Sequence, residues 1–155
     1  MLATLRAWTA AAATRRLTDM GVDARLLGSA LVCVVAQRLV RRICSDCREG
    51  YYATPDELRE LGRPAEEASP RLLARGRGCS TCGGSGFRGR IGIFEILPLT
   101  EEVRRLVVDG ASTAEIQAIA VAAGMRTLRE DGIRLCLEGV TTAAEVQRVV
   151  GEQDA

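Results

Sequence analysis

The sequence predicts a mixed α/β chain of 155 residues. Three observations indicate this class: two CxxC pairs, short β-like segments that lead into and out of them, and a C-terminal third in which helix start signals recur. At this length the chain suits one ordinary domain or two small units. Its 47% apolar residues are enough to build a core.

The N-terminal part is expected to form two helices and a strand. Good helix formers run from Ala10 to Met20, and a glycine follows as a stop signal. Asp23 is a candidate N-cap for a second helix, which apolar residues at helical spacing extend to between Cys33 and Ala36. The pattern then turns β-like over Val34–Ile43.

Two CxxC pairs dominate the middle of the chain. Cys44 and Cys47 form the first pair, and Cys79 and Cys82 form the second. Each pair places two thiols one tight turn apart, and zinc bound by four thiolates takes two ligands from each of two such knuckles. The intervening segment can be long because loop-closure entropy grows slowly with length. The sequence therefore predicts a closed structural zinc site with a role in folding rather than catalysis.

Disulfides and redox chemistry are the other uses open to these pairs. No secretory signal pattern is visible at the N-terminus, so a reducing compartment is expected, which favours metal over disulfides. A redox-active CxxC usually stands alone beside a strand–helix junction. Five nearby arginines could offset the charge of four thiolates around zinc: Arg41, Arg42, Arg48, Arg77 and Arg88.

The chain has no histidine, and all 21 of its basic residues are arginine. The first absence excludes imidazole acid–base catalysis and mixed Cys/His zinc sites. The second excludes a GxxxxGK[ST] phosphate-binding loop and Schiff-base chemistry. A net charge of +1 does not favour nucleic acid as a partner. No apolar run is long enough for direct membrane insertion.

Capping boxes and glycines divide the remainder into short elements. Thr54–Glu57 starts a short helix, residues 63–69 read as a polar linker, and Arg71–Arg77 and Phe87–Leu97 are expected strands. From Leu99 onward about four short helices should share one small core. Their start signals lie at Thr100, Ser112, Thr127 and Thr142.

The remaining cysteines and aromatic residues are interpreted as packing groups. Cys33 and Cys136 each lie in an apolar helical pattern, where a free cysteine is usually buried. Trp8, Tyr51 and Tyr52 are expected to pack in the core or around the zinc unit.

A joined series of motifs covers nearly the whole chain: Asp19–Val22, Ala36–Cys47, Gly78–Cys82, Gly86–Glu95, Gly124–Leu128 and Asp131-Gly132. Together they resemble the C-terminal part of the type II secretion and type IV pilus assembly ATPases, the secretion protein E family. The resemblance implies the edge of a RecA-like P-loop ATPase core at residues 1–43, a four-cysteine zinc insert at 44–97, and a small helical bundle at 98–155.

The resemblance also implies a cytoplasmic, hexameric motor that lies at the inner membrane through its partners. Those partners would be other motor subunits and inner-membrane platform proteins, and ATP with Mg²⁺ would be bound only by the full-length family. Arg38 and Arg41 match the family's Gln-Arg-Leu-Val-Arg motif, which implies a role at subunit contacts or near nucleotide. Alternation along the strand would also present some of Arg38, Arg41 and Arg42 to a phosphate or an acidic neighbour.

The chain departs from the family pattern at two points. The family's Walker A loop, acidic box and Walker B segment precede the region that this chain matches, and Arg6 occupies the histidine position of the family's His-Thr-Asn-Asp run. The sequence is therefore expected to be a truncated or degenerate copy, or a fragment that works beside another polypeptide. It is expected to have no catalytic residues and no ATP hydrolysis of its own.

Two features of the sequence bear on other function classes. Residues 79–86 fit the CxxCxGxG repeat of Hsp40-type chaperones, but the first pair lacks the GxG that should follow it. A zinc-ribbon nucleic-acid binder would require a basic excess and exposed aromatic residues, and the sequence indicates neither. The sequence thus favours a part of a secretion or pilus assembly motor.

Overall fold

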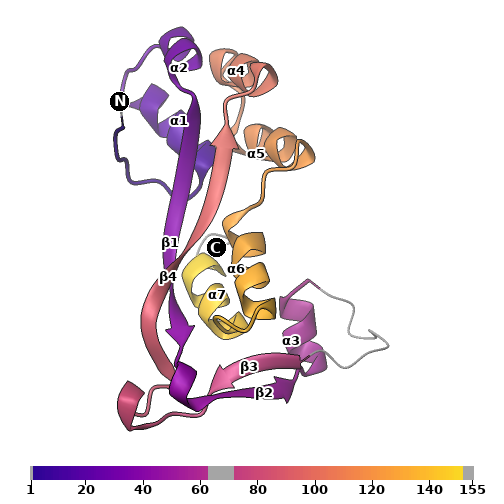
Figure 1. Ribbon diagram of the computed structural model, residues 1–155. Coiled ribbons are helices and arrows are strands. Elements are labelled where there is room, and N and C mark those ends of the chain that lie inside the picture. The colour runs from indigo at the N-terminus through magenta and orange to yellow at the C-terminus, as the bar shows by residue number, and fades with distance from the viewer. Residues whose placement is uncertain (1, 63–71, 152–155) are drawn as a thin grey trace. The chain divides into compact units, whose positions relative to one another are not determined.

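A computed structural model describes residues 2–62 and 72–151 (Figure 1). The chain divides into two compact units, residues 1–37 with 94–128 and residues 38–93 with 129–155. Its elements, in order, are α1 (Ala10–Asp19), α2 (Ala24–Ala30), β1 (Cys33–Ile43), η1 (Ser45–Cys47), β2 (Arg48–Tyr52), α3 (Pro55–Glu60), β3 (Leu72–Gly76), η2 (Ser80–Cys82), β4 (Phe87–Pro98), α4 (Glu101–Val108), α5 (Thr113–Ala122), α6 (Leu128–Leu137) and α7 (Ala143–Val150).

The described residues form two two-stranded sheets. β1 pairs with β4, and both strands contribute residues to both units. β2 pairs with β3 in antiparallel register, from Arg48 opposite Gly76 to Tyr52 opposite Leu72. The predicted linker at residues 63–69 lies outside the described residues. Among the described residues, none of the helices combines the length and apolar character that crossing a membrane requires.

A buried carboxylate anchors the first helix of the first unit. The N-terminal N–H groups of a helix have no partner within the helix and favour negative charge. In α1 the side chain of Thr9 accepts a hydrogen bond from Ala12 N–H, as expected of an N-cap. Glu95 on β4 accepts a second, 2.8 Å bond from Ala10 N–H and is only 1% exposed. The strand thereby fixes where α1 begins.

The second helix is shorter than predicted. It ends at Ala30, because Leu31 is already extended and β1 begins at Cys33. The β-branched residues that follow favour the extended backbone, and Leu99 N–H donates to Val32 C=O at 3.0 Å. The expected burial of Cys33 in a helix is therefore wrong, since its side chain lies exposed on a strand.

One hydrophobic cluster lies in the second unit. It contains Leu61, Leu73, Cys136 and Ala143, with partly buried hydrophobic residues packed against it. The predicted burial of Cys136 is confirmed, and so is the capping box that starts α3 at Thr54. The half-buried Tyr51 packs on this cluster, as expected.

The packing expected of Trp8 and Tyr52 is wrong. Trp8 is 56% exposed and Tyr52 is 67% exposed. Tyr52 lies at the end of β2, where successive side chains point to opposite sides of the strand. Tyr51 therefore faces the cluster and Tyr52 faces away from it.

The C-terminal helices begin close to their predicted start signals. Both halves of the capping box at Ser112 are formed, and α6 begins at Leu128, directly after Thr127. However, α4 and α5 belong to the first unit, whereas α7 and nearly all of α6 belong to the second. The single C-terminal bundle is therefore not confirmed, and neither is the RecA-like character of the N-terminal part.

Candidate metal centre

Two tight 3₁₀ turns in the second unit bring the four predicted cysteines together. Cys44 follows β1 and precedes η1, which ends at Cys47. Cys79 precedes η2, which ends at Cys82. Each turn places its two sulfur atoms on the same side, and the pairing of β2 with β3 brings the two turns together.

The sulfur spacing suits a tetrahedral ion. The four Sγ atoms lie within 4.8 Å of one another. The Sγ atoms of Cys44 and Cys79 lie 3.9 Å apart, and so do those of Cys47 and Cys82. The Sγ atoms of Cys79 and Cys82 lie 3.8 Å apart. Zinc–sulfur bonds of about 2.3 Å in a tetrahedron require sulfur–sulfur distances of about 3.8 Å. None of the four cysteines forms a disulfide in this structure.

Backbone N–H groups point at two of the sulfur atoms. Gly78 N–H donates to Cys47 Sγ at 3.3 Å, and the N–H groups of Cys79 and Gly86 donate to Cys82 Sγ at 3.2 and 3.3 Å. Such bonds stabilise a thiolate more than a thiol. They are the outer contacts that a metal-bound thiolate needs.

The thiols differ in acidity in the absence of metal. Hydrogen bonds from the backbone N–H groups of Cys79 and Gly86 lower the pKa of Cys82 to about 6. Burial raises the pKa of Cys47 to about 12. A divalent cation bound by the four thiolates would remove this difference in pKa, since metal ligands must be deprotonated.

Glycines let the two backbone segments that flank the second cysteine pair approach each other closely. A Cβ on Gly76 would collide with the carbonyl of Gly86, and a Cβ on Gly78 would lie 2.6 Å from the carbonyl oxygen of Gly84. Gly86 has φ +74°, which favours glycine. Its carbonyl accepts a 3.0 Å hydrogen bond from Cys44 N–H, which joins the two knuckles.

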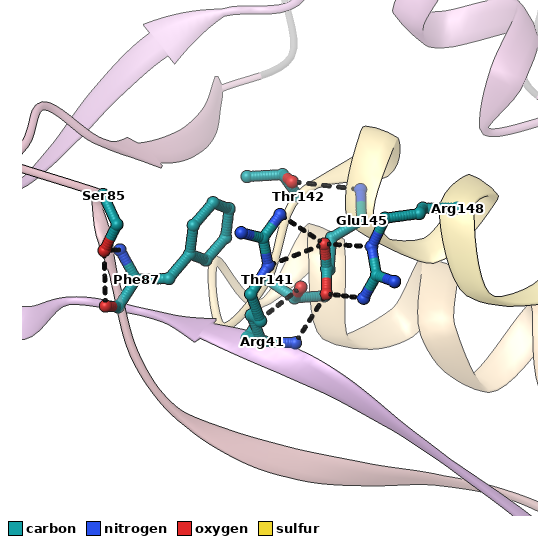
Figure 2. Close-up of polar contacts among 7 residues, drawn as sticks. All are labelled: Arg41, Ser85, Phe87, Thr141, Thr142, Glu145 and Arg148. Atoms are coloured by element: carbon teal, nitrogen blue, oxygen red, sulfur yellow. Dashed lines mark hydrogen bonds and ion pairs between the residues drawn. The ribbon is translucent and has the colours of Figure 1, made fainter.

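A buried carboxylate on α7, for which the sequence indicated only a capping box, contacts β1. Figure 2 shows Glu145 between the guanidinium groups of Arg41 and Arg148. Burial by itself raises the pKa of Glu145, but hydrogen bonds from Arg148 and Arg41 outweigh it and lower the pKa to about 2. Thr141 also donates to the carbonyl of Arg41, at 2.8 Å.

The predicted capping box at Thr142 is only half formed. Thr142 accepts a bond from Glu145 N–H, but the Glu145 carboxylate accepts from Arg41 N–H at 3.0 Å instead of returning to Thr142. The signal available in the sequence was an acidic residue beside the apolar positions Ala143 and Val146 of α7. A local pattern could not show that its partner lay on β1.

The two arginines of the resemblance have different surroundings. Arg41 donates to Glu145, and its guanidinium lies 4.3 Å from the centre of the Phe87 ring (Figure 2). Arg38, three residues earlier on β1, is half-buried. Arg41 is thus held by contacts within the second unit.

Comparisons with known proteins agree on one family. The family described as "Type II/IV secretion system protein" matches residues 1–148. The chain is 44% identical over 146 residues to the type IV pilus assembly ATPase PilB of Thermus thermophilus. It is 42% identical over 153 residues to type II secretion system protein E of Pseudomonas aeruginosa and 36% identical over 152 residues to type II secretion system ATPase E of Vibrio cholerae.

These matches cover most of this chain but a small part of each relative. They take in 94%, 99% and 98% of the chain, respectively. In the same order, they span 16%, 30% and 30% of the relatives' own length.

Proposed function

Because the chain belongs to the type II/IV secretion system protein family, we propose that it is the C-terminal, zinc-binding part of a secretion or pilus assembly motor. One observation carries this proposal: the family match extends over residues 1–148 and includes four cysteines whose sulfur atoms lie within 4.8 Å of one another. The match favours a motor part over a chaperone-like CxxCxGxG module or a zinc ribbon.

The metal proposed for the cluster is structural zinc. Cys44, Cys47, Cys79 and Cys82 would supply all four ligands, which leaves no coordination position for water. Zinc would hold the two cysteine turns together. The role proposed for the insert at residues 44–97 is therefore to maintain the shape of the motor subunit.

The N-terminal part is proposed to be the edge of a RecA-like core. Its support is an apolar face on the paired strands of the first unit, where Val35, Phe94 and Ile96 are 55%, 41% and 53% exposed. Alternation along each strand places these residues opposite the buried ones. Such a face would be covered by further polypeptide of a motor core.

ATP hydrolysis is proposed to depend on parts that this chain does not supply. The chain has no lysine for a P-loop and no histidine. ATP and Mg²⁺ would be bound by a longer motor polypeptide, and Arg38 and Arg41 would lie near subunit contacts or nucleotide. A hexameric motor on the cytoplasmic side of the inner membrane, with platform proteins as partners, is the setting proposed.

A chimera tests this function. Residues 10–148 would replace the matching region of protein E from Pseudomonas aeruginosa, so that the position of Arg6 in the His-Thr-Asn-Asp run stays that of the recipient. Secretion and ATP turnover would be measured in a strain without the native gene. The expected result is that the chimera supports secretion and hydrolyses ATP, while the separate 155-residue chain does not turn over ATP.

Two chimera variants distinguish the effect of losing the zinc ligands from the effect of replacing any cysteine. Cys44→Ser with Cys79→Ser should abolish secretion and lower zinc content. Cys33→Ser, at an exposed cysteine outside the cluster, should leave both unchanged. A folded, zinc-loaded chimera that neither secretes nor turns over ATP would contradict the proposed function.

A further inference from the structure

We propose that a pocket beside the first knuckle binds a phosphate group. The pocket has a volume of about 480 Å³ and lies entirely within the second unit. Three arginines line it, Arg42, Arg48 and Arg88, and its wall includes Ser45, Gly139 and Val140. The pocket adjoins the cysteine cluster but does not use any of the four cysteines.

The charged side chains that line the pocket are all positive. Its three charged lining residues are all arginine, and no acidic residue is among the described residues that line it. Guanidinium groups present fixed forks of N–H donors that match phosphate oxygens, and they stay charged at all accessible pH values. Three such groups around one hollow are a typical arrangement for binding a phosphate.

The pocket is separate from the ion pair of Arg41. Arg41 and Arg42 are both exposed between the buried Val40 and Ile43, but they have different surroundings. Arg41 donates to the buried Glu145, whereas Arg42 is exposed and lines the pocket. The arginine pair on this strand therefore has one structural member and one available for a ligand.

The wall of the pocket is held in place before any ligand binds. Arg48 donates to the carbonyl of Glu138 at 3.4 Å, next to Gly139. A Cβ at Gly139, where φ is +69°, would collide with the Arg48 guanidinium, so glycine makes room for it. Ile43 N–H donates to Val140 C=O at 2.8 Å and ties β1 to the same loop. A preorganised donor loses less entropy when it binds.

Asp46 competes with a ligand for Arg88. The pKa of Asp46 is lowered by hydrogen bonds from Thr81 and Ser45 and, to a lesser degree, by the charge of Arg88. Zinc-bound thiolates would also attract the arginines. Binding must therefore be measured on the zinc-loaded chain, where these charges are present.

Pyrophosphate is the probe for soluble phosphate. The zinc-loaded 155-residue chain would be titrated calorimetrically, as wild type and as the variants Arg42→Gln and Arg42→Gln/Arg88→Gln. Each lost charge-assisted contact should weaken pyrophosphate binding roughly tenfold. Arg90→Gln is the matched control, because Arg90 is an exposed arginine on the same strand as Arg88 and does not line the pocket.

Vesicles distinguish the source of the phosphate. Flotation with phosphatidylglycerol vesicles, against phosphatidylcholine vesicles, shows whether a lipid headgroup is accepted. Loss of phosphatidylglycerol binding in the pocket variants assigns a lipid phosphate to the site. A chain that binds pyrophosphate but not these vesicles assigns a soluble one.

The folding control is zinc content together with circular dichroism. If Arg42→Gln loses zinc, the comparison passes to Arg42→Lys, which keeps the charge but removes the fork and should still weaken binding more than Arg90→Gln does. Equal weakening in the pocket variants and in Arg90→Gln would overturn the proposal. Absence of binding to both probes by the folded wild-type chain would do the same.

Discussion

Arg41 on β1 and Glu145 on α7 form an ion pair across 104 positions of the sequence, with 2.8 Å between the guanidinium and the carboxylate. The Glu145 side chain is 1% exposed, whereas the side chains of Arg41 and Arg148 are 47% and 57% exposed. The carboxylate also accepts from the backbone N–H of Arg41. The pair thus joins the C-terminal helix to the strand that leads into the first cysteine pair.

Removal of the Glu145 charge should destabilise the second unit. Glu145→Gln leaves the Arg41 and Arg148 guanidiniums without their anion, and the free energy of unfolding at pH 7 should fall by about 2–4 kcal/mol. Chemical denaturation measures this. The control is Glu138→Gln, whose carboxylate is half-exposed and pairs with Arg134, and the expected change is within about 1 kcal/mol. Equal losses in the two variants would show that the buried position of Glu145 adds nothing to the free energy of unfolding.

The same carboxylate predicts an acid-sensitive step. The folded pKa of Glu145 is about 2, below the ordinary value of 4.5. A depressed folded pKa contributes stability that is complete above the unfolded pKa and is lost as pH falls toward the folded one. Stability should therefore decline between about pH 4.5 and 2, and this part of the decline, on the order of 2 kcal/mol, should be absent in Glu145→Gln. Denaturant midpoints measured over this pH range give the comparison.

Zinc removal should unfold the knuckles. Purified chain should contain one zinc ion, and chelation should lower the melting temperature and release the pairing of β2 with β3. Cys47→Ser should lose most of the zinc, because oxygen replaces a thiolate ligand, while Cys33→Ser should retain it. Metal analysis and thermal melts measure the zinc content and the melting temperature. A wild-type chain with the same melting temperature with and without chelator would exclude a structural metal.

Gly76→Ala should distort the second cysteine pair, because Gly76 precedes it, Gly86 follows it and their backbones are in contact. The added methyl group would enter the space of the Gly86 carbonyl, which is backbone and cannot rotate away. A loss of more than about 2 kcal/mol and weaker zinc retention are expected. Gly50→Ala is the control on the facing strand, since its Cβ would meet only the movable side chain of Leu72, at 3.3 Å. Similar zinc retention in both variants would argue against the close approach.

Close packing of α6 on α7 predicts rescue by a second substitution. A Cβ on Gly132 would lie 2.6 Å from Val146 Cγ1. Gly132→Ala should therefore destabilise the unit by about 1–3 kcal/mol. Val146→Ala removes the colliding methyl groups, so the double variant should be more stable than the sum of the two single losses predicts. A double-mutant cycle from denaturant melts measures this coupling, and strict additivity would contradict the contact.

The start signals of the helices could be predicted from the sequence because they are local. The box at Thr54 and Glu57 joins residues three positions apart, and so does the box at Ser112 and Glu115. The end of α2 was missed, because the extended preference after Ala30 competes with a helical apolar spacing that continues to Val34. Local signals located elements better than they located element ends.

The sequence alone determined which four residues form the candidate metal centre, since CxxC spacing places two thiols on one turn before any tertiary contact exists. Only the tertiary structure decided that Glu145 accepts from Arg41, that Gly76 lies against Gly86, and that Arg42, Arg48 and Arg88 surround one pocket. The physical reason is distance along the chain. A turn or a cap is set by neighbouring residues, whereas a buried ion pair or a charged pocket depends on which surfaces the packing of strands and helices brings together.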